Sequence, residues 1–536
     1  MSRNHWWKTT TIYQVYPLSF QDSNGDGIGD LRGIIHRLDY IASLGFETIW
    51  LSPFYKSPFR DHGYDVSSYT EVDARMGTDA DIQELIDRAH TWKLRVILDM
   101  VMNHTSDQHP WFVESKSSLD SPKRNWYIWK KGKGNQPPNN WISMTGKPGW
   151  FRDRKTDEWY YANFLEFQPD LNYRNPAVKT EMFEMAKGWL RRGADGFRLD
   201  IFNSIYKDDQ FRDNPFSPVY FPRPHALDEC FFQKKKYNLN LPESVDFARD
   251  LRNATDSTGD KLLLGEVSGD DRAIRSFLGN GEDALGLVFN FAAIEYQYNA
   301  HFFADILKRN EEHFSDPYLP TLVFGNHDVP RSIGRVHGSI EKWKVLAILQ
   351  FSARGVPVSY YGEEIGMTNG DVAVADAQDP IAQANKLIPK FLAHLLGVFL
   401  TRDDCRTPMQ WDSSPNHGFS TANPWNPIGK SPERTVAGQE RDEHSLLTFY
   451  RKLLAVRKSH AALHSGLAEE IKTTGSILSF DRVYGKEKAS VYLNFSSISA
   501  RVKGGAGTVL IATGEVLQHK DEIELGPHSA LILAHD

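Results

Sequence analysis

Acidic residues at the ends of short apolar runs are the side chains in this sequence that are best placed to do chemistry. The clearest case is the run 193–200, in which Phe197 and Leu199 alternate with Arg198 and Asp200 after a glycine that can end a helix. The alternation places the Arg and the Asp on one face of a buried strand. Charged groups in such a place are costly unless they are paired or used. The run is therefore either a structural ion pair inside a barrel or part of a reactive site.

The same pattern of an apolar run that leads to a carboxyl group occurs four times in the chain. The other runs lead to the following polar residues: Asp99, Asn103 and His104 after 96–98, Glu266 after 262–265, and His327 and Asp328 after 321–324. The carboxyl ends of parallel barrel strands converge on one face, where active sites lie. We therefore expect Asp200, Glu266 and Asp328 to meet there, where carboxyl groups could act as nucleophiles or proton donors. Independent structural ion pairs would not need to repeat the pattern.

A parallel barrel would position these acids, and the sequence contains apolar runs for eight strands. The predicted strands are 11–16, 48–51, 96–99, 197–199, 262–265, 285–291, 321–324 and 357–361. Amphipathic patterns predict helices at 33–44, 180–191 and 446–456. From about residue 467 the sequence changes to alternating segments that are split by Gly-rich turns, which predicts a small antiparallel β domain.

Taken in order, the four acidic runs resemble the signature sequences of the alpha-amylase superfamily, glycoside hydrolase family 13. Residues 99–104, 196–200, 265–266 and 326–328 resemble its first, second, third and fourth signatures. Residues 168–172 and 406–411 are similar to sequences that are typical of the oligo-1,6-glucosidase and alpha-glucosidase branch. The resemblance extends from about Trp7 to the C-terminus. It implies an α/β fold, a TIM (β/α)8 barrel with a loop-rich domain inserted after strand 3 and a C-terminal antiparallel β domain.

We expect three domains with boundaries that follow from these patterns. The barrel would comprise residues 1–103 and 174–466, the inserted domain B residues 104–173, and the C-terminal domain residues 467–536. Five Trp residues crowd the inserted domain, where most of them would form a small aromatic core. An insertion at about 207–240 is long enough to cap a pocket and limit it to short substrates. A second insertion, about 370–442, carries Arg402 and the stretch 406–411. We expect the lysine run 234–236 to face solvent.

The resemblance implies a retaining, exo-acting alpha-glucosidase that releases glucose from the non-reducing end of short alpha-glucosides. Such an enzyme breaks the bond through an oxocarbenium-like state, with one carboxylate as nucleophile and one carboxylic acid as proton donor. Asp200 would be the nucleophile and form a covalent glucosyl intermediate, with Arg198 keeping it ionised. Glu266 would be the acid and base, with a pKa raised by burial and neighbouring carboxylates. Asp328 would hold sugar hydroxyls and distort the ring.

The resemblance also implies a set of substrate-binding residues. They are Asp61 and Arg402 on a glucose hydroxyl, Tyr64 stacked on the ring, His104 and His327 as hydrogen-bond donors, Phe164 in the pocket wall, and Arg198 and Ile201 beside the nucleophile. The position of Ile201 is commonly Val in relatives that favour α-1,6 bonds and Ala, Gly or Thr in those that favour α-1,4 bonds. Ile is closest to Val in shape, so it favours tolerance of α-1,6 links. Without the resemblance, Asp61 would be interpreted as a surface acid, and Arg406 is better explained as a structural partner of Asp403 or Asp404.

Other functions remain open beside hydrolysis. A transglucosylase or a sucrose or trehalose isomerising enzyme shares the covalent intermediate and differs only in the acceptor. A catalytically inactive amylase-like binding protein, of the kind that accompanies amino-acid transporters, would carry a membrane helix and lack catalytic acids. Here the acids are present, and no run of about 18 apolar residues occurs. Small alpha-glucosides such as maltose, isomaltose or sucrose are the expected partners, and the chain is expected to be a monomer or a homodimer.

Composition narrows the class of protein further. The chain has 536 residues, a net charge of −7 and 40% hydrophobic residues, which suits a large core and indicates neither a nucleic-acid nor an anionic-membrane partner. Its two cysteines, Cys230 and Cys405, cannot form a disulfide framework. The first residues lack the apolar core of a signal peptide, so a cytoplasmic location is expected.

Residues 22–30 (Asp-Ser-Asn-Gly-Asp-Gly-Ile-Gly-Asp) place oxygen side chains at alternate positions with glycines between them. This pattern suits a hard cation, although a polar Gly-rich turn is the simpler alternative. The resembled family binds calcium in the same loop, so a structural calcium ion is the expected cofactor, with magnesium also possible. Its ligands would be the side chains of Asp22, Asn24, Asp26 and Asp30 and the carbonyl of Ile28.

Overall fold

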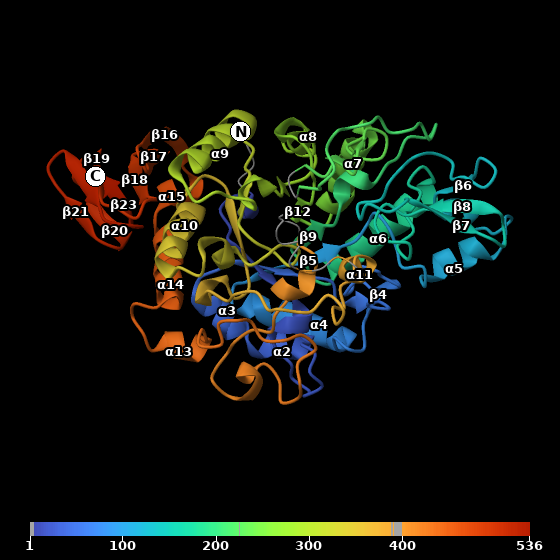
Figure 1. Cartoon of the computed structure of the whole chain (residues 1–536), viewed down its shortest axis with the longest axis horizontal. Coiled ribbons are helices and arrows are strands. Elements are labelled where there is room, and N and C mark those ends of the chain that lie inside the picture. Colours follow the sequence, from blue (N-terminus) through green and yellow to red (C-terminus); the bar gives the residue numbers. More distant parts are fainter. Residues whose placement is uncertain (1–4, 224–225, 387, 389, 391–398, 536) are drawn as a thin grey trace.

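The structure is a computed structural model, and it describes residues 5–223, 226–386, 388, 390 and 399–535. Figure 1 shows three parts along the long axis: a barrel in the middle, a small sheet at one end and a larger antiparallel β domain at the other. The predicted fold class is confirmed.

Eight parallel strands form the barrel, and they lie where the apolar runs predicted them. They are β1 (Ile12–Val15), β2 (Thr48–Leu51), β5 (Arg95–Met100), β9 (Gly196–Leu199), β12 (Leu262–Gly265), β13 (Leu287–Val288), β14 (Thr321–Val323) and β15 (Val356–Tyr360). Their order is β13-β12-β9-β5-β2-β1-β15-β14. The sixth strand, β13, is shorter than predicted. Between it and β14 the barrel is closed by the hydroxyl of Thr321, which donates to the carbonyl of Val288 and accepts from the backbone N–H of Asn290.

The longer helices cover the outside of this barrel. The longer ones are α4 (Asp79–Thr91), α6 (Pro176–Arg191), α7 (Pro242–Asp256), α9 (Ala300–His313), α10 (Ile340–Ser352) and α14 (Leu446–Ser459), and the shorter ones are α1 (Pro17–Phe20), α8 (Asp271–Ser276), α11 (Pro380–Ala384), α13 (Val436–Glu440) and α15 (Ala461–Ser465). The helix predicted at 33–44 is two helices, α2 (Leu31–His36) and α3 (Leu38–Leu44). Arg37 breaks it, with a non-helical φ of −114° and ψ of 11°. Its guanidinium packs 4.0 Å from the centre of the Trp411 ring, which holds it there.

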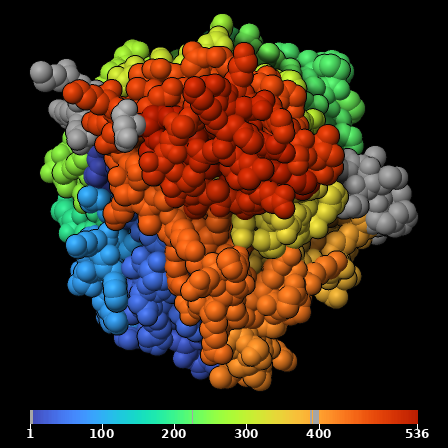
Figure 2. All heavy atoms as spheres, turned by 90° about the vertical axis from the view of Figure 1, so that its left-hand side faces the viewer, coloured from blue at the N-terminus to red at the C-terminus, as the bar shows by residue number. Residues whose placement is uncertain are grey.

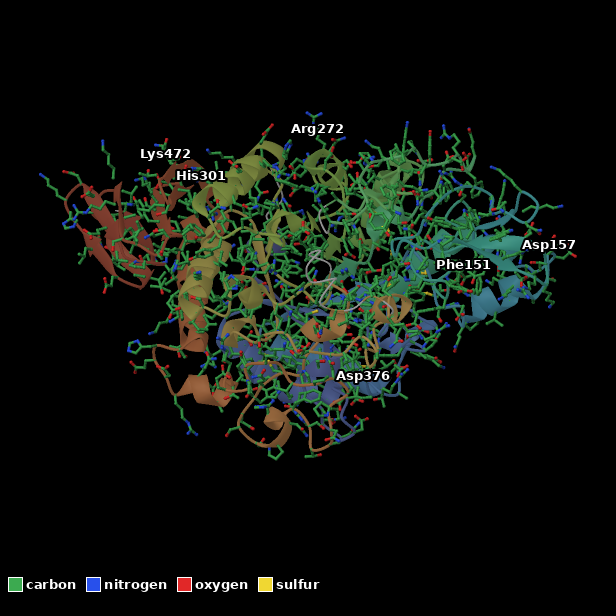
Figure 3. The ribbon with its side chains drawn as sticks, viewed as in Figure 1. Phe151, Asp157, Arg272, His301, Asp376 and Lys472 are labelled. Atoms are coloured by element: carbon green, nitrogen blue, oxygen red, sulfur yellow. The ribbon has the colours of Figure 1, made fainter. Side chains whose placement is uncertain are left out.

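Residues 104–173 contain the helix α5 (Pro110–Ser117) and a three-stranded antiparallel sheet of β6 (Trp129–Lys131), β7 (Trp150–Asp153) and β8 (Glu158–Tyr161) in the order β6-β8-β7. Trp141, Trp150 and Tyr161 pack together as a small aromatic core. Figure 3 places Asp157, in the turn between β7 and β8, at the outer tip of this part of the molecule. Two further strands follow β2 in the chain, β3 (Tyr55–Lys56) and β4 (Ser68–Val72), and they pair with each other as an antiparallel hairpin.

The insertion after Asp200 carries the hairpin of β10 (Glu229–Cys230) and β11 (Gln233–Lys234) and docks on residues 139–146. Trp141 Nε1 donates to the carbonyl of Arg212, and Asn140 Nδ2 to that of Asn214. The expectation that the lysine run faces solvent is wrong for Lys235, which is 1% exposed and donates to the carbonyls of Ile142 and Ser143. Burial lowers the pKa of Lys235 to about 8. The insertion is thus tied to the inserted domain.

The C-terminal β domain has a five-stranded sheet and a three-stranded sheet. The strands are β16 (Leu467–Thr474), β17 (Ile477–Tyr484), β18 (Glu487–Asn494), β23 (Ala530–His535) and β20 (Thr508–Thr513) in the first, and β19 (Ala500–Lys503), β22 (Glu522–Leu525) and β21 (Val516–Gln518) in the second. Figure 2 shows this domain from the end of the molecule that it forms, above the helices of the barrel. β16 packs on α9, and His301 and Lys472 lie at this junction (Figure 3).

Candidate active site

Arg198 brings three carboxyl groups together at the carboxyl ends of the barrel strands. Its Nη1 donates to Asp99 Oδ1 at 2.9 Å and to Asp200 Oδ1 at 2.8 Å, and its Nη2 donates to Glu266 Oε2 at 2.5 Å. The side chains of Arg198 and Asp99 are 2% and 0% exposed, whereas those of Asp200 and Glu266 keep 13% and 23%. The buried pair therefore supports two carboxyl groups that remain accessible.

Asp200 and Glu266 are partly buried, and each has one carboxyl oxygen that accepts no hydrogen bond from Arg198. Glu266 Oε2 accepts from Arg198 and from the backbone N–H of Ile201, and Asp200 Oδ1 accepts from Arg198. Glu266 Oε1 and Asp200 Oδ2 accept no hydrogen bond from the residues that the structure describes. Neither atom is a buried unpartnered one. One carboxyl group thus has an oxygen free to carry a proton, and the other an oxygen free to attack.

The charges of this cluster do not balance, and its pKa values shift accordingly. Burial raises the pKa of Glu266 to about 7; the Arg198 cation opposes this shift, and Asp200 and Asp328 add to it. Burial also raises the pKa of Asp200 to about 7, against the lowering by Arg198. One guanidinium shared by one fully buried and two largely buried carboxyl groups cannot keep all of them ionised. Arg198 therefore limits the shift at Asp200 but does not abolish it, and the cluster retains a proton near neutral pH.

A chain of hydrogen bonds connects Asp99 to His327 through Tyr64. Tyr64 Oη donates to Asp99 Oδ2 at 2.9 Å and lies 2.7 Å from His327 Nε2. Gln14 Nε2 donates to His327 Nδ1 at 2.8 Å, so the proton of the neutral ring is assigned to Nε2. Burial lowers the pKa of His327 to about 3. Its N–H therefore lies between Tyr64 and Asp328 Oδ2, which is 3.2 Å from Nε2.

Arg402 gathers a second group of acids beside the first. Its Nη2 donates to Asp61 Oδ1 at 2.6 Å and to Asp379 Oδ1 at 2.8 Å, and its Nη1 donates to Asp328 Oδ1 at 3.3 Å. Gln168 Nε2 donates to the other oxygen of Asp61 at 2.9 Å. The structure thus brings Asp61, Arg402 and Asp328 together.

Asp328 has two guanidinium groups against it, and its side chain is 32% exposed. Arg406 Nη2 donates to Asp328 Oδ1 at 3.0 Å. Burial works to raise the pKa of Asp328, but His327, Arg402 and Arg406 outweigh it and hold the pKa well below its usual range. The expectation that Arg406 pairs with Asp403 or Asp404 is therefore wrong. Asp328 stays ionised, in contrast to Glu266.

Three further predicted site residues are Ile201, His104 and Phe164, and the structure connects only the first two to the residues of this centre. Ile201 follows Asp200 in the left-handed region, with φ 38° and ψ 45°. His104 Nε2 lies 3.2 Å from the carbonyl oxygen of Tyr64, and its Nδ1 lies 3.2 Å from Asn103 Nδ2, so both ring nitrogens have protein partners. Phe164 is half-buried, and its backbone carbonyl accepts from Thr145.

A buried ion pair supports this side of the site from outside it. The ammonium of Lys207, which is 4% exposed, contacts Asp170 and donates to Asn103 Oδ1 at 2.8 Å. Asn103 Nδ2 in turn donates to Asp170 Oδ2. These three residues come from the insertion after β9, from the inserted domain and from the segment after β5, so the pair ties these segments together next to His104.

Sequence reasoning missed three side chains of the site. Asp379 is fully buried against Arg402. Gln168 contacts Asp61, and Arg406 contacts Asp328. Gln168 and Arg406 lie within stretches already identified as typical of the alpha-glucosidase branch, which is a signal that could have found them. Asp379 lies alone in a polar insertion, where its pattern Asp-Pro indicates only the start of the helix α11.

The predicted metal loop is well ordered by its own side chains. Asp22 Oδ1 accepts the backbone N–H groups of Asn24 and Gly25, and Asp26 Oδ1 accepts that of Ile28. Asp30 caps α2 by accepting from Gly33. Within the described ranges, no group of three or more His, Cys, Asp or Glu residues is gathered as a metal site. The carboxylate oxygens of the loop thus accept hydrogen bonds from its own backbone, and the metal stays a prediction.

Comparison with known proteins agrees with this geometry. The chain matches the family description "Alpha amylase, catalytic domain" over residues 14–466. A probable alpha-glucosidase of Rhizobium meliloti (strain 1021) is 40% identical over 512 residues, which cover 92% of this chain and 90% of the relative. An oligo-1,6-glucosidase of Bacillus cereus is 35% identical and covers 97% and 96%.

Solved structures show the same similarity. A crystal structure of an alpha-glucosyl transfer enzyme has a TM-score of 0.92, 34% identity and 100% coverage of both chains. The trehalulose synthase of Pseudomonas mesoacidophila MX-45 has a TM-score of 0.89, 29% identity and 99% coverage of both chains. No helix in the described part of the chain is long and apolar enough to cross a membrane.

Proposed function

Because this chain belongs to the alpha-amylase family, and within it to the alpha-glucosidase branch of glycoside hydrolases, we propose that it releases glucose from short alpha-glucosides with retention of configuration. The observation that carries this proposal is the shared contact of Arg198 with Asp200 and Glu266. It supports two accessible carboxyl groups, each with a second oxygen that accepts no hydrogen bond from the guanidinium.

In the first step, Glu266 donates the proton on Oε1 to the glycosidic oxygen while Asp200 Oδ2 attacks the anomeric carbon. The bond to the leaving sugar breaks, and a glucosyl ester of Asp200 forms. The raised pKa of Glu266 keeps this group protonated near neutral pH. In the second step, ionised Glu266 takes a proton from water, which attacks the same carbon and releases glucose and free Asp200.

The second acid group accounts for attack at the non-reducing end. Asp61 and Asp328 are held by Arg402, whose contacts fix them in one geometry. Carboxyl oxygens fixed in this way can accept hydrogen bonds from the hydroxyls of a terminal glucose. We propose that they close the pocket around a single glucose unit, with maltose, isomaltose and sucrose as candidate substrates.

Glucosyl transfer is the second candidate function. The high similarity to an alpha-glucosyl transfer enzyme over the whole chain favours it, because the covalent intermediate is the same and only the acceptor differs. The cytoplasmic location and a monomeric or homodimeric state remain predictions.

Product analysis tests the function directly. The protein would be incubated with maltose, isomaltose, sucrose and trehalose, and the first products followed by proton NMR. We expect α-glucose as the first anomer, and new oligosaccharides at high substrate concentration if transfer competes. Release of β-glucose first, or no reaction with any of the four sugars, would contradict the proposal.

We also propose that the loop 22–30 binds one calcium ion with a structural role. Asp22, Asn24, Asp26 and Asp30 would supply side-chain oxygens and Ile28 its carbonyl. The support is their alternate spacing, which suits the several oxygen ligands that calcium prefers. No catalytic step needs the ion.

A further inference from the structure

Asp379 accepts more hydrogen bonds from Arg402 than Asp61 or Asp328 does. Arg402 Nη2 donates to Asp379 Oδ1 at 2.8 Å, and Arg402 Nε donates to Asp379 Oδ2 at 3.1 Å. Asp61 and Asp328 each accept one hydrogen bond from the same guanidinium, at 2.6 and 3.3 Å. The guanidinium therefore turns its Nε–Nη2 edge to Asp379 and reaches each of the other two carboxyl groups with a single N–H group.

The backbone of the insertion at about 370–442 holds Asp379 in place. Asp379 Oδ2 accepts the backbone N–H of Arg402 at 2.7 Å, and Oδ1 accepts that of Ile381 at 3.0 Å, which caps the start of α11. The backbone N–H of Asp379 itself donates to Asp403 Oδ2. The Asp379 side chain is 0% exposed, against 32% for that of Asp328. Asp379 is thus a fixed carboxyl group that is closed to solvent.

This arrangement gives Arg402 a permanent partner inside the protein. A carboxylate that accepts two parallel N–H groups fixes the plane of a guanidinium as well as its position. Burial works to raise the pKa of Asp379, but the Arg402 cation outweighs it and lowers the pKa to about 2, so the group is ionised at neutral pH. Because Asp379 is buried, this partner is not exchanged for solvent when a substrate enters the pocket.

The contact matters for the pocket because Arg402 has other carboxyl groups within reach. Its side chain is only 10% exposed, so without Asp379 the Nε–Nη2 edge would need another acceptor. Asp61 and Asp328 already contact the guanidinium and are the nearest candidates. A closer pair with either one would draw the guanidinium toward it and cover an oxygen that a sugar hydroxyl needs. A purely structural ion pair would stabilise the insertion without this consequence.

We propose that Asp379 is a positioning residue of the glucose pocket: it anchors Arg402, and Arg402 in turn fixes Asp61 and Asp328. Asp379 acts through Arg402 and is not itself a catalytic residue. The inference rests on the proposed function, in which Asp61 and Asp328 accept hydrogen bonds from a terminal glucose. Both members of the anchoring pair belong to the insertion at about 370–442, which thereby forms part of the pocket and does more than cover it.

The variant Asp379→Asn tests this role by its effect on binding and on turnover. The amide keeps the size of the side chain and one acceptor oxygen, but its NH2 group faces an N–H donor of Arg402. The Kd of glucose, measured by isothermal titration calorimetry, and KM for an aryl α-glucoside should both rise at least about tenfold, the loss expected for one charge-assisted hydrogen bond. We expect kcat to change by less than about threefold, since Asp200 and Glu266 keep their contacts with Arg198.

A second variant and a control separate geometry from charge. Asp379→Glu retains the charge and moves the carboxylate by one methylene group in a site that is closed to solvent, so it should also bind glucose more weakly. Asp371→Asn is the matched control. It removes a carboxylate of the same insertion that pairs with Lys390 and Lys430 and is 60% exposed, and it should bind glucose like the unmodified protein.

Thermal unfolding of each protein shows the temperature below which it is folded, and binding is measured there. Folded Asp379 variants that bind glucose as tightly as the unmodified protein would overturn the inference. A fall in kcat without weaker glucose binding would overturn it as well, because Asp379 would then act on the chemistry. If the unmodified protein neither binds glucose nor hydrolyses the glucoside, the proposed function itself is wrong, and the inference falls with it.

Discussion

The backbone N–H of Ile201 donates a hydrogen bond to Glu266 Oε2 at 3.1 Å, so the residue after the proposed nucleophile holds the proposed acid. Ile201 does so from the left-handed region, with φ 38° and ψ 45°, which is an outlier for a β-branched residue. Backbone of this kind costs about 1–3 kcal/mol and persists where the surroundings fix it. The turn after β9 therefore sets the distance between the nucleophile and the acid.

Replacing Ile201 should change the preferred linkage. Its β-branched side chain is stiff at the first torsion and is partly exposed beside Asp200, so we expect it to present a fixed bulge to the leaving sugar. We expect Ile201→Ala and Ile201→Thr to raise the ratio of kcat/KM for maltose over isomaltose, by about 10–200-fold at most. A ratio unchanged within about twofold would leave Ile201 as a packing residue and move linkage selection to the insertions.

Activity should depend on pH through the carboxyl cluster around Arg198. Glu266 must be protonated to act as an acid, so kcat/KM for maltose should fall as the pH rises through about 7. Asp200 must be ionised to attack, so activity should also fall on the acid side, and the two limbs belong to the cluster as a whole. An activity that stays level from pH 6 to 9 would contradict the raised pKa of Glu266.

Lys207 should be important for stability, although it does not contact Asp200, Glu266 or Asp328. Lys207→Met leaves Asp170 buried without its cation, which should lower the free energy of unfolding by about 3–5 kcal/mol. The double variant Lys207→Met with Asp170→Asn should be less destabilised, because no charge is then left unpaired. Denaturant unfolding of the three proteins measures this, and equal losses in single and double variants would argue against a buried pair.

Removing the proposed calcium ion should destabilise the fold and leave the chemistry intact. A chelator should lower the melting temperature, because a ligand that binds only the folded state adds stability by mass action. Asp26→Ala should lower it as well, and the chelator should then have no further effect. If the chelator leaves the melting temperature of the unmodified protein unchanged, the loop is a polar turn without an ion.

The sequence predicted the barrel strands closely because buried strands have a strong local signal. The runs before Asp200 and Glu266 are apolar and end at the acid, so the strand and the site residue are found together. The break at Arg37 was not predictable in this way, since the apolar positions of 33–44 keep their helical spacing across it. At the break, Arg37 contacts Trp411 and donates to Gln21, and both residues lie outside the predicted helix.

The same limit applies to charged residues that pair over long distances. Lys235 was predicted to face solvent because it lies in a lysine run, but the fold buries it against residues 142 and 143. Arg406 was expected to pair with Asp403 or Asp404, which are next to it in the sequence. It contacts Asp328 instead, which lies 78 residues earlier in the chain. Local sequence shows that a charge is present, and only the packing of distant segments decides its partner.

The division of roles between Glu266 and Asp200 is the central claim, and the Glu266→Gln variant tests it most directly. Turnover is measured on maltose and on an aryl glucoside whose leaving group needs no proton. The ratio of the two turnovers in the variant is then compared with the same ratio in the unmodified protein. The account predicts a loss of several orders of magnitude on maltose and a much smaller loss on the aryl glucoside, with Asp200→Asn inactive on both. Equal losses on the two substrates in Glu266→Gln would show that Glu266 is not the proton donor.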